Sequence, residues 1–274
     1  MLDILLSTYN GEKYLAQQLD SLFAQTYRNF KVYIRDDGSI DKTLDIIRYY
    51  SKRNPQLIEI INDNYGNIGA FKSFMRLLNI SQSHYIMFCD QDDIWFPKKI
   101  EKAILKIKEI ESKHENNKPI LIFTDLTIVD ENLNVINRSF WKHQKIDCRI
   151  SLNWKNLLAQ NVVTGCTIII NQAVKSIVFP YPETNIVHDQ WISINVSKKG
   201  YIFWINEPTI YYRQHNENLE GAKKFSLQYS FKKITKIKVI IEFYKNMSLF
   251  FNNEISVINI IARKIIINIQ RLMM

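Results

Sequence analysis

Three carboxylates, Asp90, Asp92 and Asp93, lie within four residues, directly after the apolar run at residues 85–89. Like charges at such close spacing are unfavourable unless a cation neutralises them. Carboxylate oxygens are hard ligands, which Mg²⁺ and Mn²⁺ prefer, and these ions commonly join a few carboxylates to a diphosphate. The alternative is a solvated acidic turn ahead of the helix that Pro97 predicts. The choice depends on which other groups lie at the same edge of the fold.

Two further polar clusters follow apolar runs earlier in the chain. Residues 7–10 (Ser-Thr-Tyr-Asn) offer hydroxyls, an amide and the N–H groups of a helix start, which suit a ribose or a phosphate. Residues 36–39 (Asp-Asp-Gly-Ser) supply a carboxylate that can accept from a base N–H or a ribose hydroxyl. The second cluster also has a plain structural interpretation, as a turn followed by Asp41 as a helix cap. Alone, each cluster is a weak signal.

The elements expected around these clusters bring them together. Short apolar runs at residues 2–6, 31–35, 57–61 and 85–89 predict strands, and apolar residues at helical spacing predict a helix after each. This alternation predicts an α/β fold with a parallel sheet, whose ligands bind at the carboxyl ends of the strands. All three clusters follow such ends. Their shared edge favours a ligand site over a solvated acidic turn.

After residue 118 the pattern is less regular. Strands are expected at residues 120–123, 126–129, 135–136, 167–170, 201–205 and 209–213, with a short helix at 189–197. From residue 225 onward, lysine-rich segments with apolar and aromatic residues predict two helices.

The net charge of +9 is concentrated at the C-terminal end. Residues 221–274 hold ten Lys or Arg and two acids, a balance of +8, so residues 1–220 carry about +1. A nearly neutral body without a recognised binding motif weighs against a nucleic-acid-binding protein. The basic residues 232–238 predict an amphipathic helix that lies on an anionic membrane surface or packs on the body of the protein.

Several protein classes are disfavoured by what the sequence lacks. No Gly-x-Gly-x-x-Gly follows the first apolar run, which disfavours an NAD-dependent dehydrogenase. The three cysteines are scattered and predict neither disulfides nor a zinc site. A signal peptide and a transmembrane run of about eighteen apolar residues are also missing. We therefore expect a cytoplasmic protein, peripheral at the inner face of the cell membrane.

The order of the motifs resembles family 2 glycosyltransferases of the GT-A fold. The resemblance rests on residues 4–11 (Ile-Leu-Leu-Ser-Thr-Tyr-Asn-Gly), 35–39 (Arg-Asp-Asp-Gly-Ser), 67–69 (Asn-Ile-Gly) and 89–95 (Cys-Asp-Gln-Asp-Asp-Ile-Trp). Residues 164–166, 188–191 and 212–215 resemble the bacterial rhamnosyltransferase branch. The resemblance covers about residues 2–222. It implies a GT-A-type α/β fold with a mainly parallel central sheet in residues 1–222, followed by a basic helical region at 223–274.

The resemblance also implies a role for each matching residue. Asp36 or Asp37 is expected to bind the base of the nucleotide. The residues expected to contact the nucleotide sugar as a whole are Thr8, Asn10, Glu12, Asp36, Asp37, Asn67, Gly69, Asp90, Gln91 and Arg213. Those expected to hold Mn²⁺ or Mg²⁺ are Asp90, Asp92 and His215. Asp189 is the implied catalytic base, with His188 as a second candidate because it stands where the family more often has Glu. Those expected at the acceptor or in support are Asp93, Gly165, His188 and Trp191, the last equally interpretable as core.

Sugar transfer needs a cation to neutralise the leaving diphosphate and a base to take the acceptor proton. Only one such base is indicated and no second carboxylate is placed as a nucleophile, so a single displacement with inversion is predicted. The rhamnosyltransferase likeness favours dTDP-rhamnose as donor and a saccharide or lipid-linked saccharide of the cell surface as acceptor. The alternative donor is a UDP-hexose or UDP-N-acetylhexosamine. The Gln-x-x-Arg-Trp signature of processive synthases is absent, which favours single addition.

Overall fold

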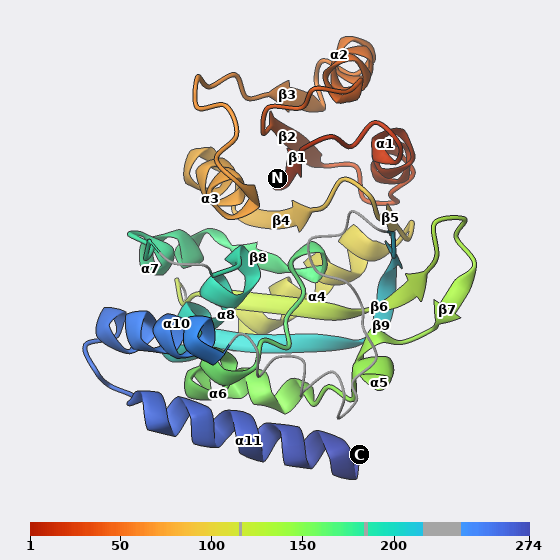
Figure 1. Ribbon diagram of the computed structural model, residues 1–274. Coiled ribbons are helices and arrows are strands. Elements are labelled where there is room, and N and C mark those ends of the chain that lie inside the picture. Colours follow the sequence, from red (N-terminus) through yellow and green to blue (C-terminus); the bar gives the residue numbers. More distant parts are fainter. Residues whose placement is uncertain (115–116, 184–185, 216–236) are drawn as a thin grey trace.

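The computed structural model describes residues 1–114, 117–183, 186–215 and 237–274, and one large β-sheet runs through its centre (Figure 1). Eight of the nine strands of the sheet follow the order β3-β2-β1-β4-β8-β6-β9-β5, and the ninth, β7, pairs with β6. The strands are β1 Leu2–Thr8, β2 Phe30–Asp36, β3 Ile58–Ile60, β4 Tyr85–Cys89, β5 Ile94–Trp95, β6 Ile120–Val129, β7 Val135–Asn137, β8 Ile169–Asn171 and β9 Tyr201–Arg213.

The sheet is parallel in its first half and mixed in its second. Strands β3, β2, β1 and β4 are all parallel, as the alternation of strand and helix predicts. Strand β8 then lies antiparallel between β4 and β6, while β6 and β9 are parallel to each other. The carboxyl ends of β1, β2 and β4 therefore meet at one edge, where the polar clusters were expected.

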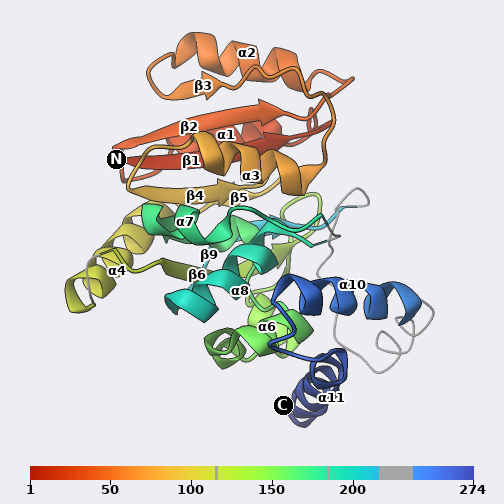
Figure 2. The same cartoon turned by 90° about the vertical axis from the view of Figure 1, so that its left-hand side faces the viewer.

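Both faces of the sheet are apolar because successive side chains of a strand point to opposite sides. In β4, Ile86 and Phe88 belong to one hydrophobic core, while Met87 and Cys89 belong to the other. Side chains of α1, α2 and α4 fill the second core; those of α3, α6, α7 and α8 fill the first, and Figure 2 shows α3, α7 and α8 toward the viewer. The protein thus has three layers, helices–sheet–helices.

The helices largely follow the predicted spacing of apolar residues. In α1, for example, Leu15, Leu19 and Leu22 are fully buried on one side. The first helices are α1 Leu15–Phe23, α2 Thr43–Arg53, α3 Ala70–Ile80 and α4 Lys99–Lys113. The later ones are α5 Phe140–Gln144, α6 Trp154–Ala159, α7 Lys175–Val178, α8 His188–Lys199, α10 Ile237–Phe250 and α11 Val257–Met273. Short 3₁₀ turns span Cys148–Leu152, Gly165–Thr167 and Gln172–Val174.

Two pairs of expected strands are each one continuous strand. The runs at 120–123 and 126–129 are joined in β6, and those at 201–205 and 209–213 are joined in β9. The pairing register between them shifts where Thr124 lies opposite Ile205 and Asp125 lies opposite Pro208. Proline has no N–H to donate and is tolerated at such a bulge. The break in the pattern therefore marks a bulge, not the end of a strand.

The described part of the C-terminal region consists of two helices, as expected. Helix α11 contacts α6, and α6 contacts α8, so this region packs on the same side of the sheet as α8 (Figure 1). Of the basic run at 232–238, residues 232–236 lie outside the described part of the chain. Within the described ranges, no helix has the length and apolar character needed to cross a bilayer.

Gly200 connects α8, which carries Asp189, to β9, which leads to His215. A Cβ atom at this glycine would lie 2.0 Å from the main-chain oxygen of Pro119, which accepts from the N–H of Tyr201. Main chain in a sheet moves less readily than a flexible side chain, so the substitution must distort this junction.

We therefore expect Gly200→Ala to lower the free energy of unfolding by about 1–3 kcal/mol. Urea unfolding followed by circular dichroism measures this change. The neighbouring exposed Lys199→Ala serves as the control and should stay close to the parent protein. Equal stability of the two variants would show that the junction has room for a methyl group.

Candidate active site

The loops after β1 and β2 are joined by hydrogen bonds at the carboxyl edge of the sheet. The hydroxyl of Thr8 donates to Asp36 Oδ1 at 2.8 Å, and Asp36 also accepts from the hydroxyl of Ser39 at 2.6 Å. The N–H of Asn10 donates to Ser39 Oγ at 2.8 Å, and Asn10 Oδ1 accepts from the N–H of Ile40 at 2.9 Å. The two polar clusters therefore form one wall, as predicted.

Gln91 fastens the acidic loop after β4 to this wall. Its Oε1 accepts from the N–H of Tyr9 at 2.8 Å, and its Nε2 donates to the carbonyl of Tyr9 at 2.9 Å. The Gln91 side chain also lies so close to the main chain of Gly11 that a Cβ on Gly11 would be 2.4 Å from Gln91 Oε1. The amide of Gln91 thus positions the loop, which differs from the direct contact to the nucleotide sugar implied by the resemblance.

Asp37 lies beneath the surface and supports the loop before α3. Its carboxylate accepts from Arg35 and from the N–H groups of Ile68 and Gly69, at 2.5, 2.9 and 2.8 Å. Arg35 continues the buried network to Asp63. Asp37 is 3% exposed, whereas Asp36 is only partly buried. Asp36 is therefore the better placed of the two to meet a ligand.

Glu12 and Asn67 lie at the margins of this wall. Glu12 Oε2 accepts from the N–H of Lys42 at 2.9 Å, which ties the β1–α1 loop to the start of α2. Asn67 is exposed, and its main chain passes near Gly38.

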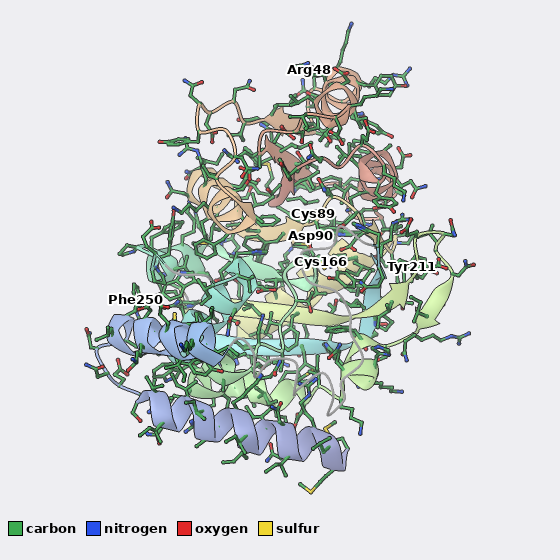
Figure 3. All side chains as sticks on the ribbon, viewed as in Figure 1. Arg48, Cys89, Asp90, Cys166, Tyr211 and Phe250 are labelled. Atoms are coloured by element: carbon green, nitrogen blue, oxygen red, sulfur yellow. The ribbon has the colours of Figure 1, made fainter. Side chains whose placement is uncertain are left out.

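Asp90 lies near Cys166, which the sequence did not single out as a site residue (Figure 3). Asp93 belongs to the same cluster. One ligand atom from each of the three lies within 4.8 Å of the other two. Burial, with repulsion from Asp92 and Asp189, raises the pKa of Asp90 to about 7. Burial and the charges of Asp92 and Asp90 raise the pKa of Asp93 well above its usual range. A cation here would lower these pKa values, because opposite charge favours the ionised form.

Asp92, the third carboxylate of the acidic loop, contacts His215. Asp92 Oδ2 and His215 Nε2 are 2.8 Å apart, and the His215 ring lies 4.8 Å from that of Tyr14, centroid to centroid. The ligand atoms that lie within 4.8 Å of one another among the described residues are those of Asp90, Asp93 and Cys166, whereas the expected set was Asp90, Asp92 and His215. Carboxylate oxygens and an imidazole nitrogen are donors that Mn²⁺ accepts, and the oxygens suit Mg²⁺. Asp93 Oδ2 is buried and accepts no hydrogen bond of ordinary geometry from the described residues. These groups fit a divalent cation.

Asp189 lies in the first turn of α8 and faces the acidic cluster. Its charge acts on Asp90. Asp189 Oδ2 accepts from the N–H of Gly165 at 2.9 Å, and Oδ1 accepts from Asn161 Nδ2 at 3.1 Å. The structure therefore brings Asp189 beside residues nearly a hundred positions earlier, as the resemblance implies.

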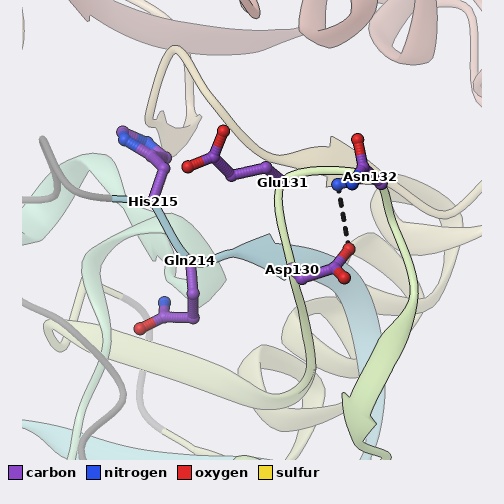
Figure 4. Close-up of a pocket in the computed structure, with 5 residues that line it drawn as sticks. All are labelled: Asp130, Glu131, Asn132, Gln214 and His215. Carbon is purple, nitrogen blue, oxygen red and sulfur yellow. Dashed lines mark hydrogen bonds between the residues drawn. The ribbon is translucent and has the colours of Figure 1, made fainter.

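A polar hollow of about 440 Å³ opens beside His215 (Figure 4). It is lined by Asp130, Glu131, Asn132, Gln214 and His215. Because His215 also contacts Asp92, the hollow lies next to the acidic cluster.

Comparison with known proteins assigns this site to a family. The sequence model of Glycosyl transferase family 2 matches residues 3–177, well over half of the chain. The chain belongs to this family. It is therefore a sugar-transferring enzyme, and the expectations of family and enzyme class are confirmed.

Individual relatives agree with this assignment. The dTDP-rhamnosyl transferase RfbG of Shigella flexneri is 28% identical over 228 residues, covering 79% of this chain and 74% of that protein. WfaP of Escherichia coli, a UDP-Glc:alpha-D-GlcNAc-diphosphoundecaprenol beta-1,3-glucosyltransferase, is 28% identical over 219 residues, covering 80% and 74%. The structure of S. aureus TarS 1-349 in complex with UDP-GlcNAc has a TM-score of 0.63 at 18% identity, covering 96% of this chain and 70% of that one. The GT-A-type fold is thereby confirmed.

Arg213 has different partners in this glycosyltransferase from those implied by the resemblance. It is 2% exposed, and its guanidinium donates to the carbonyls of Asp92 and Glu131 and to Gln17 Oε1, at 3.0, 2.7 and 2.6 Å. Instead of reaching out as a clamp on a diphosphate, it holds the loop that carries Asp92.

His188 and Trp191 are core residues of the glycosyltransferase. The His188 ring packs on Phe74, with centroids 4.2 Å apart, and its Nε2 is buried without a partner among the described residues. A Cβ on Gly165 would lie 2.5 Å from that nitrogen, so Gly165 permits this packing. Trp191 is 1% exposed and donates to the carbonyl of Val178 at 2.9 Å. These positions favour Asp189 over His188 as the base, and core over sugar contact for Trp191.

Three residues of the site were missed by sequence reasoning. Cys166 is part of the motif at 164–166, which pointed to the right place without assigning the thiol a role. Asn161 and Tyr14 have no local signal, because their importance comes from contacts with Asp189 and His215.

Burial lowers the pKa of His188 to about 3, so the folded enzyme keeps this ring neutral. The unfolded chain takes up a proton near pH 6.5, so protonation of the unfolded state reduces stability as pH falls from about 7 toward 3. Between about pH 7 and about pH 5, His188 should account for a loss of about 2 kcal/mol. Comparing urea unfolding of the parent and His188→Gln at both pH values measures this. The same pH dependence in both proteins would mean that the ring is solvated or charged.

Proposed function

We propose that the enzyme is an inverting, metal-dependent glycosyltransferase that transfers rhamnose from dTDP-rhamnose to a saccharide acceptor in cell-surface polysaccharide biosynthesis. The proposal is carried by one observation, the convergence of Asp90, Asp92 and Asp189 at the carboxyl edge of the sheet. Carboxylates that hold a diphosphate and a carboxylate that takes a proton are the two parts that this chemistry needs.

The donor nucleotide is proposed to lie along the wall formed by the loops after β1 and β2. Asp36 is partly exposed there, held by Thr8 and Ser39, and can accept from a base N–H or a ribose hydroxyl. Asn10 lies beside it through Ser39. Because Gln91 joins this wall to the acidic loop, a nucleotide bound on the wall would direct its diphosphate toward Asp90 and Asp92.

Asp90, Asp92 and His215 are proposed to hold Mn²⁺ or Mg²⁺. When bound, the cation supplies Lewis-acid stabilisation of the charge that grows on the departing diphosphate. The contribution of the chain is to fix these ligands. Arg213 holds the carbonyl of Asp92, and Tyr14 supports the ring of His215.

Asp189 is proposed as the general base. Its carboxylate is oriented by Asn161 and by the N–H of Gly165, and faces Asp90. The base removes the proton from the acceptor hydroxyl as that oxygen attacks the anomeric carbon, and the diphosphate leaves from the opposite side. One displacement inverts the anomeric centre. His188 is buried and neutral in the folded protein and takes no part in this step.

The donor assignment rests on the likeness to the dTDP-rhamnosyl transferase RfbG. The second candidate is a UDP-hexose or UDP-N-acetylhexosamine, because WfaP uses UDP-Glc and TarS has been solved with UDP-GlcNAc. WfaP acts on a diphosphoundecaprenol-linked sugar, which supports a lipid-linked saccharide as the acceptor. The hollow beside His215 is lined by polar groups and is proposed to receive part of the acceptor.

The true donor should raise the melting temperature of the enzyme only when Mn²⁺ or Mg²⁺ is present. Ligand that binds the folded state stabilises it by RT ln(1 + [L]/Kd), about 2.7 kcal/mol at a hundredfold excess over Kd. Thermal shift with dTDP-rhamnose, UDP-glucose, UDP-galactose and UDP-GlcNAc distinguishes the donors. Asp92→Ala should lose the metal-dependent shift for the true donor, and tight metal-independent binding by that variant would refute the metal role.

Asp189→Asn should bind the donor like the parent enzyme but lose transfer. The amide keeps the size of the side chain but cannot accept the acceptor proton, and such a base typically contributes about 10²–10⁴-fold to the rate. The readout is transfer to a defined saccharide acceptor, with donor-induced thermal stabilisation measured on the same sample. His188→Gln is the matched neighbour and should retain transfer. Full activity in Asp189→Asn would assign the base to another residue.

A further inference from the structure

Helix α11 exposes its apolar side and turns its cations toward the body of the protein. A continuous stripe of large apolar side chains is 44–78% exposed, comprising Ile258, Ile265, Ile266, Ile269, Leu272 and Met273. Spacings of three, four and seven residues place these side chains on one side of the helix. A helix that merely covers a globular body has the reverse arrangement, with its apolar side inward.

The opposite side of α11 is held by polar contacts. Arg263 donates to Asn156 Oδ1 at 2.6 Å, and Lys264 donates to Gln160 Oε1 at 2.5 Å. Arg271 is 6% exposed and donates to the carbonyl of Gln144. Ile260 and Ile267 are buried on this same side. The contacts fix the orientation of the helix, which lies at the outer edge of the molecule (Figure 1), and the apolar stripe is left exposed.

We propose that the α11 stripe is a membrane-docking surface that lies on an anionic lipid bilayer. Arg263, Lys264 and Arg271 hold the helix on the body of the protein, so only the apolar stripe would enter the acyl boundary. An interfacial helix likewise buries its apolar side in the lipid, and its binding is strengthened by cations elsewhere on the protein that attract anionic lipid. Residues 221–274 carry +8, which is complementary to anionic lipid.

A second copy of the chain fits the stripe less well. A helix of seventeen residues is about 25 Å long, and a stripe covering a third of its circumference buries only a few hundred Å². A standard protein interface needs about 800 Å² from each partner. Pairing two copies through α11 would also bring two segments of charge +8 together. Area and charge both favour lipid.

The proposal does not depend on which sugar is transferred, because it is tested without substrate. The full chain is floated with vesicles of phosphatidylcholine alone or of phosphatidylcholine with phosphatidylglycerol. The test variant is Ile265→Asn/Ile269→Asn, which removes apolar surface from the middle of the stripe without adding charge. The control is Leu105→Asn, since Leu105 is 64% exposed on α4, on the other face of the sheet. Melting temperatures confirm that all proteins are folded.

The parent and Leu105→Asn should float with the anionic vesicles, more weakly at high salt, because screening weakens the attraction of cations to lipid. The double variant should bind on the order of tenfold more weakly, from the apolar area it loses. Equal flotation of the double variant would overturn the proposal, as would equal binding to both kinds of vesicle. A parent protein that stays unbound, whether monomeric or dimeric through α11 by sedimentation equilibrium, would also overturn it.

Discussion

The crowding of carboxylates at the end of β4 is the constraint on which the rest of the site depends. Burial is the main cause of the raised pKa values of Asp90 and Asp93, and repulsion from neighbouring carboxylates, Asp92 for both and Asp189 for Asp90, adds to it. The fold keeps them there with fixed donors. His215 meets Asp92, the N–H of Arg213 meets Asp93, and the N–H of Gly165 meets Asp189. Carboxylates arranged this way would be stabilised by a bound cation, because opposite charge favours their ionised form.

The sheet topology explains how residues so distant in sequence reach this place. Parallel β1, β2 and β4 bring three loops to one edge, and hydrogen bonds from Thr8 to Asp36 and from Tyr9 to Gln91 join them. The second half contributes from the other side of the cluster. Asp189 enters from the first turn of α8, and His215 follows β9. The wall proposed for the nucleotide and the proposed base Asp189 thus belong to different halves of the fold, and Asp90 follows the strand where the two halves meet.

The first half of the fold could be predicted from local pattern because each strand is a short apolar run followed by an amphipathic helix. The location of the site followed from the same pattern, since polar residues came directly after the strands. The hydrogen-bond partners of the site residues could not be predicted from this pattern. Arg213 has the charge expected of a residue that binds a diphosphate, but its guanidinium donates to the carbonyls of Asp92 and Glu131. Its direction depends on the bulged pairing of β6 with β9, at Asp125 and Pro208, which no local pattern reveals.

The orientation of helix α11 also could not be predicted from the local sequence pattern. Its spacing of isoleucines predicts an amphipathic helix, and the usual inference would bury the apolar stripe against the body. In the structure the inward side of α11 carries Arg263, Lys264 and Arg271, which donate to oxygen atoms of α6, of the residue that follows α6 and of the end of α5. Exposing isoleucine side chains to water is unfavourable, so the outward stripe favours contact with an apolar partner. The basic residues 232–238 predict a helix that lies on a membrane or packs on the body, and residues 232–236 lie outside the described part of the chain. The membrane-docking surface that we propose lies on α11 instead, where apolar area would supply the attachment and net positive charge the preference for anionic lipid.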